Sequence, residues 1–518
     1  METYILLIFG GLLVILLQWL KRAWSSLPLP PGPTRYPIIG NLLNMPRSMP
    51  WKTYQKWSQS YGDILYMKIP NQHIVVLCSV DAALDLLDKR SDLYSDRPYT
   101  VMNDLMGKYR WNFAMMRYSP LWRSHRREFH QFFNQHEVLK YRSIQLRECR
   151  KFLHRSLCDP THIAEHIRLI FSAIILKITF DMDVSDMNYE YIQVALKALE
   201  GLNLAQTPGK FWVDFFPFLQ YLPRWIPGAQ FKQFLDYYNP LVEKMLSLPL
   251  DTTTRSIGDI SAGTSVLANL IKRYSRDKDE KALCQKEEDL IRNVTGLAYG
   301  AAADTTTIAA QAFFVAMSLY PDVQRKAQEE LDRVVGPHRL PEFDDYDNLI
   351  YIQAIALESM RWIPVIPLGV PHSVIRDDEY RGYLIPKGAT IYTNVWSICH
   401  DPIAYPEPER FNPGRFIKDG RLDPDVRNPL DFTFGFGRRL CPGRWLSGGS
   451  LFMTIASVLH TLNINPIIGP DGKAFDPFSE SVSNAIKMSV GQVPCTTTPR
   501  SDMARRLIHE WAELPESH

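Results

Sequence analysis

One cysteine near the C-terminus is framed by residues that suit a thiolate ligand. Cys441 stands in the segment Phe434-Gly-Phe-Gly-Arg-Arg-Leu-Cys-Pro-Gly443, directly before a helical pattern that begins near Arg444. No second cysteine lies at disulfide-motif or metal-site spacing from it. A single thiolate in such a place can serve as the axial ligand of a haem iron, where it favours O–O cleavage.

The neighbours of this cysteine each have a physical reason to be there. Gly437 is expected to let the backbone fold closely around the sulfur, and Gly443 to let the following helix pass flat against a porphyrin. The amides at the helix N-terminus favour the thiolate over the thiol. Arg439 offers a charged partner for a haem propionate. A lone cysteine is more often an inert buried residue, so it is the combined framing that favours a ligand.

A second segment, residues 297–310, predicts a helix of small residues. It carries one carboxylate, Asp304, followed by the hydroxyls of Thr305, Thr306 and Thr307. Small side chains would let a flat ring and dioxygen lie against the helix. The Thr305 hydroxyl can donate to a backbone carbonyl one turn back, which tends to bend a helix. Alone, this pattern is more typical of a solvent-facing helix.

Together the two segments resemble the cytochrome P-450 monooxygenases. The spacing of five residues matches that family's haem-binding loop at every position: Phe434, Gly437, Arg439, Cys441 and Gly443. The similarity extends along nearly the whole chain and is greatest to the fungal, microsomal, secondary-metabolism branch. It implies a mainly α fold with small β-sheets, and haem b (iron protoporphyrin) with Cys441 as its axial thiolate ligand.

The resemblance also implies roles for individual side chains. Asp304 and Thr305 match the acid–alcohol pair that delivers protons to dioxygen. Trp122 and Arg126 match the helix that grips one haem propionate. His372 holds a position at which the family binds the other propionate, although a loop histidine satisfied by its neighbours explains it equally well.

Three further residues are expected to be structural. Glu358 and Arg361 stand three residues apart on a predicted helix, a spacing that normally gives a surface contact of about 0.2–0.5 kcal/mol. Their neighbours are apolar, which indicates burial instead. In the family such a pair meets an arginine from a later loop, here Arg415, and locks the meander that leads to Cys441.

Hydrophobic periodicity and turn residues predict the elements around these sites. Strands are expected at 64–69, 73–78, 380–385 and 390–393, the first two as a hairpin, and helices at 81–90, 323–335, 349–362 and 444–462. The polar stretches 251–265 and 275–289 are expected to be surface loops.

Composition excludes several classes of protein. The 58 basic and 56 acidic residues nearly cancel, which gives no support to nucleic-acid binding. The seven cysteines follow no framework pattern, which favours a reducing compartment. No linker or repeat divides the chain. We therefore expect a membrane anchor at 1–26 and a single catalytic domain at 27–518.

The anchor prediction rests on an uncharged apolar run. Residues 3–20 would span roughly 27 Å as a helix, enough for a thin endoplasmic-reticulum bilayer. Lys21 and Arg22 follow it, so the positive-inside rule leaves the rest of the chain cytosolic in a single-pass topology. A cleaved signal peptide is the alternative, but basic residues would then precede the apolar run.

The expected activity is the oxidation of a hydrophobic small molecule such as a terpenoid. The segments that the family places over the haem are apolar here: Met102, Met106, Val294, Leu297, Ala301, Val365, Ile366, Leu368, Val482 and Ile486. The resemblance implies electrons from NADPH through a separate NADPH–cytochrome reductase. A haem-thiolate isomerase or dehydratase and a haem carrier or sensor are the alternatives. The aromatic stretch 211–225 fits core packing and a membrane-dipping loop equally well.

Overall fold

The computed structural model describes residues 27–184, 186–207, 209–226, 228–256, 264–275, 283–467, 478 and 493–513. The predicted anchor at 1–26 lies outside the described residues, as do Val482 and Ile486. Within these described ranges, no helix combines the length and the apolar character that a membrane crossing needs.

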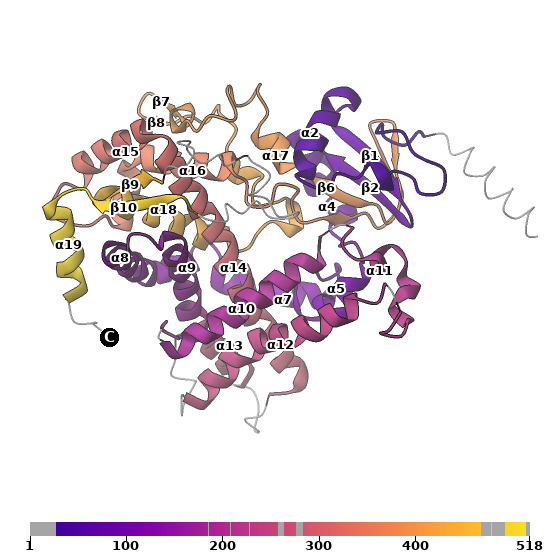
Figure 1. The fold of residues 1–518 in the computed structure, drawn as a ribbon, viewed down its shortest axis with the longest axis horizontal. Coiled ribbons are helices and arrows are strands. Elements are labelled where there is room, and N and C mark those ends of the chain that lie inside the picture. The colour runs from indigo at the N-terminus through magenta and orange to yellow at the C-terminus, as the bar shows by residue number, and fades with distance from the viewer. Residues whose placement is uncertain are drawn as a thin grey trace, which may run out of the picture.

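Most of the described chain is helical, which confirms the predicted fold class (Figure 1). The helices are α2 (Pro50–Tyr61), α3 (Val80–Ala83), α4 (Ser91–Tyr94), α5 (Val101–Leu105), α6 (Lys108–Trp111), α7 (Pro120–Phe133), α8 (Arg142–Cys158), α9 (Ile163–Phe180), α10 (Asp186–Ala205), α11 (Trp212–Phe215), α12 (Phe231–Ser256), α13 (Val266–Ser275), α14 (Gln285–Leu319), α15 (Pro321–Val334), α16 (Ile350–Trp362), α17 (Val395–Cys399), α18 (Arg444–Thr461) and α19 (Asp502–Glu513).

The strands form small sheets at two ends of the molecule (Figure 1). They are β1 (Ile64–Ile69), β2 (Gln72–Leu77), β3 (His372–Ser373), β4 (Asp378–Tyr380), β5 (Tyr383–Ile385), β6 (Thr390–Thr393), β7 (Ile417–Lys418), β8 (Arg421–Leu422), β9 (Leu462–Pro466) and β10 (Cys495–Pro499). The largest sheet has the order β1-β2-β6-β3, with β1 and β2 antiparallel as predicted and β2 parallel to β6. It holds β3, and with it His372, beside α4.

Several predicted boundaries need correction. The strand expected at 380–385 is a two-stranded hairpin, because Arg381 and Gly382 adopt positive φ angles of 52° and 79° and turn the chain between β4 and β5. The predicted loop at 251–265 begins later, since α12 continues to Ser256, and the loop at 275–289 ends earlier, since α14 begins at Gln285. The helix expected at 81–90 is α3 followed by the π-helical turn η2 (Leu84–Lys89).

The long helix α14 crosses the centre of the molecule and positions the site (Figure 1). It packs against α9, α12, α16 and α18, and most of its residues from Ile291 to Ser318 are buried. All seven cysteines are free thiols, as the sequence predicted.

Candidate active site

A cavity lies between α14, α7 and the loop that carries Cys441. It holds about 1880 Å³ of space free of protein atoms, part of it continuous with solvent. Its walls include Cys441 and Thr305, which the sequence placed in one site although 136 positions separate them. Trp122, Arg126, His372 and Arg439 also line it. The fold therefore brings the predicted cofactor-binding residues to one cavity.

Gly437 and Gly443 shape the Cys441 loop, but the close contact at Gly437 differs from the one expected from the sequence. Gly437 has a φ of +53°, and a Cβ there would stand 2.2 Å from the carbonyl oxygen of Leu87. Its close approach is therefore to η2 and not to the sulfur. A Cβ at Gly443 would meet no protein atom within 4 Å. Gly443 lines the cavity, so the space that it leaves open belongs to a ligand.

Cys441 is held in its loop by a backbone hydrogen bond. Its amide donates to the carbonyl oxygen of Phe434 at 2.8 Å, which closes the loop. Burial raises the pKa of the Cys441 thiol, while the amides of Gly443 and Arg444 and the guanidinium of Arg126 lower it. The helix N-terminus thus acts in the predicted direction, but burial outweighs it. A thiolate ligand must lose its proton when it binds a metal, and the raised pKa opposes that loss.

On the opposite wall, α14 presents small residues and two threonines, Thr305 and Thr306. Ala298, Ala301, Ala302 and Thr305 recur at helical spacing and line the cavity. The Thr305 hydroxyl donates to the carbonyl oxygen of Ala301 at 2.8 Å, the contact one turn back that the sequence predicted. Asp304, the next residue toward the N-terminus, is half-buried and is not among the cavity-lining residues.

Arg439 is buried and anchors the Cys441 loop to the chain between α4 and α7. Its guanidinium donates to the carbonyl oxygens of Ser95 at 2.8 Å, Phe113 at 3.2 Å and Met116 at 2.7 Å. Its charged group also lies 4.4 Å from the ring centroid of Trp122, a cation–π contact. Burial lowers the pKa of Arg439 to about 9.

Two further arginines share this cavity. Arg126 donates to the carbonyl oxygen of Leu440, so it touches the cysteine loop directly. Arg97, which sequence analysis missed, donates to the carbonyl oxygens of Ala114 at 2.8 Å and of Pro371 at 2.6 Å. Its signal in the sequence is only one arginine before a proline, with no periodicity to mark it. Burial and the charge of Arg439 hold the pKa of Arg97 well below its usual range.

His372 is buried on β3 beside these arginines. Its Nδ1 lies 2.8 Å from the carbonyl oxygen of Tyr94. A carbonyl only accepts, so Nδ1 carries the proton and Nε2 of the neutral ring is an acceptor. Burial, Arg97 and Arg439 hold the pKa of His372 well below its usual range. The ring can donate to a carboxylate in the cavity only after it gains a second proton.

The residues of this cavity fit a haem. Arg97 and Arg439, which are buried, share one space with the half-buried Arg126, and the hydrogen bonds of these arginines described above go to neutral carbonyl oxygens. The nearby carboxylate of Asp96 is engaged by Arg117 at 2.8 Å and by the amide of Tyr118. Buried cations without carboxylates of their own call for an anionic ligand. Haem b carries two propionates, and Cys441 supplies the metal ligand in the same cavity.

The predicted structural trio is assembled and buried. Arg361 donates to Glu358 through Nε at 2.6 Å and Nη2 at 2.9 Å, and both side chains have 0% exposure. Arg415 donates to the same carboxylate at 3.2 Å. The predicted burial is confirmed, and the trio joins α16 to the loop before β7.

The predicted substrate-facing residues divide into two groups. Leu297, Ala301, Val365 and Ile366 line the cavity. A correction is needed for Met102, Met106, Val294 and Leu368, which are buried but pack into the apolar core instead of lining the cavity. For the two methionines the reason is that α5 is held toward α11, with the amide of Met102 donating to Asp214 at 2.9 Å.

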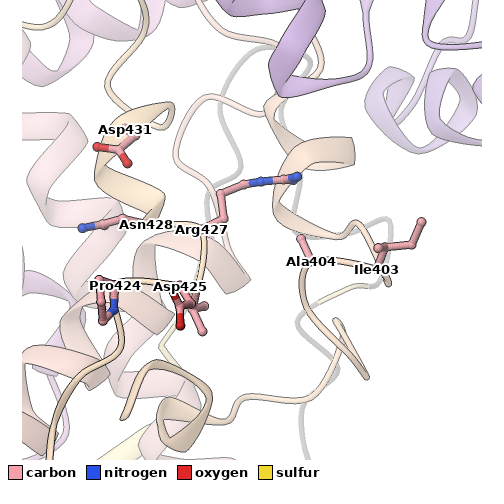
Figure 2. Close-up of a pocket in the computed structure, with 8 residues that line it drawn as sticks. Ile403, Ala404, Pro424, Asp425, Arg427, Asn428 and Asp431 are labelled. Carbon is pink, nitrogen blue, oxygen red and sulfur yellow. The ribbon is translucent and has the colours of Figure 1, made fainter. Parts of the chain in front are cut away.

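Asn293, Val294 and Thr295 form the sequence of an N-glycosylation acceptor, and a hollow lies on the surface at Arg427. Asn293 is 4% exposed and donates through Nδ2 to Nε2 of His125 at 3.2 Å, so it is not presented for glycosylation. The hollow is lined by residues that include Arg427, Asn428 and Asp431 (Figure 2), and it holds about 770 Å³ of atom-free space, part of it open solvent. None of the predicted site residues lines this hollow.

Comparison with known proteins agrees with the geometry. Residues 30–488 match the family described as Cytochrome P450. The chain is 41% identical to "Cytochrome P450 monooxygenase COX1" of Coprinopsis cinerea over 90% of each chain, and 40% identical to "Cytochrome P450 monooxygenase COX2" of the same fungus over 93% of this chain and 91% of the relative. A monooxygenase of Armillaria gallica is 38% identical over 96% of this chain and 97% of its own. The chain therefore belongs to the cytochrome P450 family of monooxygenases, oxidoreductases that use haem b with a cysteine thiolate as the axial ligand.

Proposed function

We propose that this monooxygenase hydroxylates or otherwise oxidises a hydrophobic small molecule, a terpenoid or similar secondary metabolite. The observation that carries the proposal is the cavity lining. Among the described lining residues, the ionisable side chains besides Cys441 and His372 are the three arginines that fit the haem propionates. The remaining wall is dominated by Leu297, Ala301, Val365 and Ile366 and their apolar neighbours. Such a wall favours a substrate held by shape and apolar contact.

In this proposal Cys441 supplies the axial ligand, while Trp122, Arg126, His372, Arg439 and Arg97 hold the propionates. The haem, when bound, supplies the oxidising chemistry, and the protein supplies binding, orientation and proton control. The Thr305 hydroxyl donates to the carbonyl oxygen of Ala301 in the structure. Rotation away from that carbonyl lets it donate a proton into the cavity, and Asp304 returns a proton to the path.

Electrons are proposed to come from an NADPH–cytochrome reductase that docks beside the cysteine loop. Exposed cations gather there: Arg123 and Arg438 lie 5.9 Å and 5.4 Å from the ring centroid of Tyr118. Arg444 donates to the carbonyl oxygen of Cys441 at 3.3 Å. A basic surface next to the ligand loop suits an acidic electron donor, because opposite charges steer association.

The enzyme is proposed to sit on the endoplasmic-reticulum membrane, with residues 1–26 as a single-pass anchor and residues 27–518 as one cytosolic domain. Four aromatic side chains of the 211–225 stretch support a second membrane contact. Trp212 and Phe218 are 58% and 63% exposed, and Tyr221 and Trp225 are both 81% exposed. Exposed aromatic rings of this kind favour the membrane–water interface. Core packing accounts for Phe215, which is 9% exposed.

The proposal is tested with the full-length chain co-expressed with a fungal reductase in a host supplied with terpenoid scaffolds. A product carrying one atom from ¹⁸O₂, formed only with NADPH and reductase, is the expected result. The Cys441→Ser variant serves as the control without the thiolate ligand. Product formed without NADPH would favour the isomerase or dehydratase reading, and haem binding with no NADPH consumption would favour a carrier or sensor.

A further inference from the structure

Three consecutive threonines on α14 direct their hydroxyls differently. Thr305 and Thr307 donate to the carbonyl oxygens of Ala301 and Ala303, at 2.8 Å and 2.6 Å. The hydroxyl of Thr306 lies instead 3.1 Å from the hydroxyl of Ser447 on α18. Two of the three side chains therefore bond within their own helix, while the middle one joins two helices.

The two helices carry opposite parts of the site. Ser447 is in the first turn of α18, and its amide donates to the carbonyl oxygen of Gly443 at 3.0 Å. Ser447 follows Cys441 by six positions along the chain. Thr306 directly follows Thr305 on α14. Both hydroxyl-bearing residues line the cavity, and Thr306 is 4% exposed. Their hydrogen bond thus spans from the cysteine-bearing wall to the threonine-bearing wall.

The other side of α18 is held as well. On α8, Gln145 donates through Nε2 to the carbonyl oxygen of Leu446 at 3.1 Å and to the hydroxyl of Ser450 at 2.7 Å. The first turns of α18 are therefore fixed between α8 and α14. The hydrogen bonds to α8 and the hydroxyl contact to α14 therefore lie on two sides of the same helix segment.

We propose that Thr306 and Ser447 are a positioning pair, whose hydroxyl–hydroxyl bond sets the width of the haem slot between α14 and the Cys441 loop. Neither residue needs to touch the reacting atoms. The pair acts by holding the two walls at one separation, because packed helices that lose a directional contact settle at a slightly different distance. The inference rests on haem binding, which family membership establishes, and not on the proposed substrate.

The test uses the full-length holoprotein and measures how fast it releases haem to excess apomyoglobin. Thr306→Val and Ser447→Ala each remove one hydroxyl, and the double variant removes both. Thr307→Val is the matched control, since Thr307 is also 4% exposed but bonds only to its own helix. Thr306→Ser keeps the hydroxyl and should restore the slow rate.

We expect Thr306→Val and Ser447→Ala each to release haem about 2- to 10-fold faster, the range that one lost hydrogen bond allows. The double variant should release it no faster than the quicker single variant, because both remove the same contact. The Soret band of the reduced carbon monoxide complex should broaden in the same variants. Rates within twofold of the Thr307→Val control, strictly multiplicative effects in the double variant, or no rescue by Thr306→Ser would each overturn the proposal. None of these readouts depends on finding the substrate.

Discussion

The buried carboxylate of Glu358 gives the sharpest prediction about stability. It accepts hydrogen bonds from Arg361 at 2.6 Å and 2.9 Å, from the amide of Asn412 at 2.8 Å and from Arg415 at 3.2 Å. Arg361→Met removes two of these and strips donors from the carbonyl oxygens of Cys399 and Pro408. Removing one partner of a buried ion pair costs up to about 3–5 kcal/mol, because the remaining carboxylate stays buried and keeps only Arg415 and the amide of Asn412 as partners.

That loss is a large part of the free energy of unfolding of a typical domain, which is about 5–15 kcal/mol. We therefore expect Arg361→Met to lower the urea midpoint of the full-length holoprotein strongly and to reduce the yield of haem-loaded protein. Glu358→Gln combined with Arg361→Met should lose less stability than the two single variants together, because both substitutions remove the same ion pair. Arg410→Met is the matched control, because Arg410 also pairs with an acid three residues away, Glu407, but with both side chains 60% or more exposed.

The control should lose at most about 1 kcal/mol, as surface pairs do. Urea midpoint, followed by circular dichroism and by the carbon monoxide difference spectrum, reports each variant. If Arg361→Met and Arg410→Met have the same urea midpoint, the buried network does not stabilise the fold by the expected amount. If the double variant loses as much stability as the two single variants together, the two side chains do not act as one ion pair.

Three further predictions concern the cavity itself. Cys441→Ser should abolish the strongly red-shifted Soret band of the reduced carbon monoxide complex, whereas Cys149→Ser should keep it, and retention in Cys441→Ser would contradict the ligand assignment. Thr305→Ala should keep haem content but lower product per NADPH, with peroxide formed instead, since positioned proton transfer contributes about 10²–10⁴-fold; unchanged coupling would remove Thr305 from the mechanism. Because burial raises the pKa of Cys441 and a thiolate ligand must lose its proton to bind a metal, haem affinity should rise as the pH rises, which a titration of haem binding measures. A haem affinity that does not change with pH would contradict the raised pKa of the Cys441 thiol.

Local patterns predicted the elements well where one physical cause dominates. The hydrophobic periods of α15, α16 and α18 place them within about two residues of their observed bounds, a usual margin for helix ends. The burial of Glu358 and Arg361 followed from their apolar neighbours. The hairpin at β4 and β5 was missed because Arg381, a residue that rarely takes a positive φ, supplies half of its turn.

What the sequence could not provide is how charges add up once distant segments meet. Arg97, Arg126 and Arg439 are 29 and 313 positions apart along the chain, so no window of sequence shows that they share one cavity. Their mutual repulsion and burial lower the pKa of Arg97, and the same burial raises the pKa of Cys441 against the pull of its helix N-terminus. Both pKa shifts disfavour the charged forms of these two side chains. Bound propionates would favour the charged arginines, and a bound iron would favour the thiolate of Cys441, so both shifts oppose charges that a haem would stabilise.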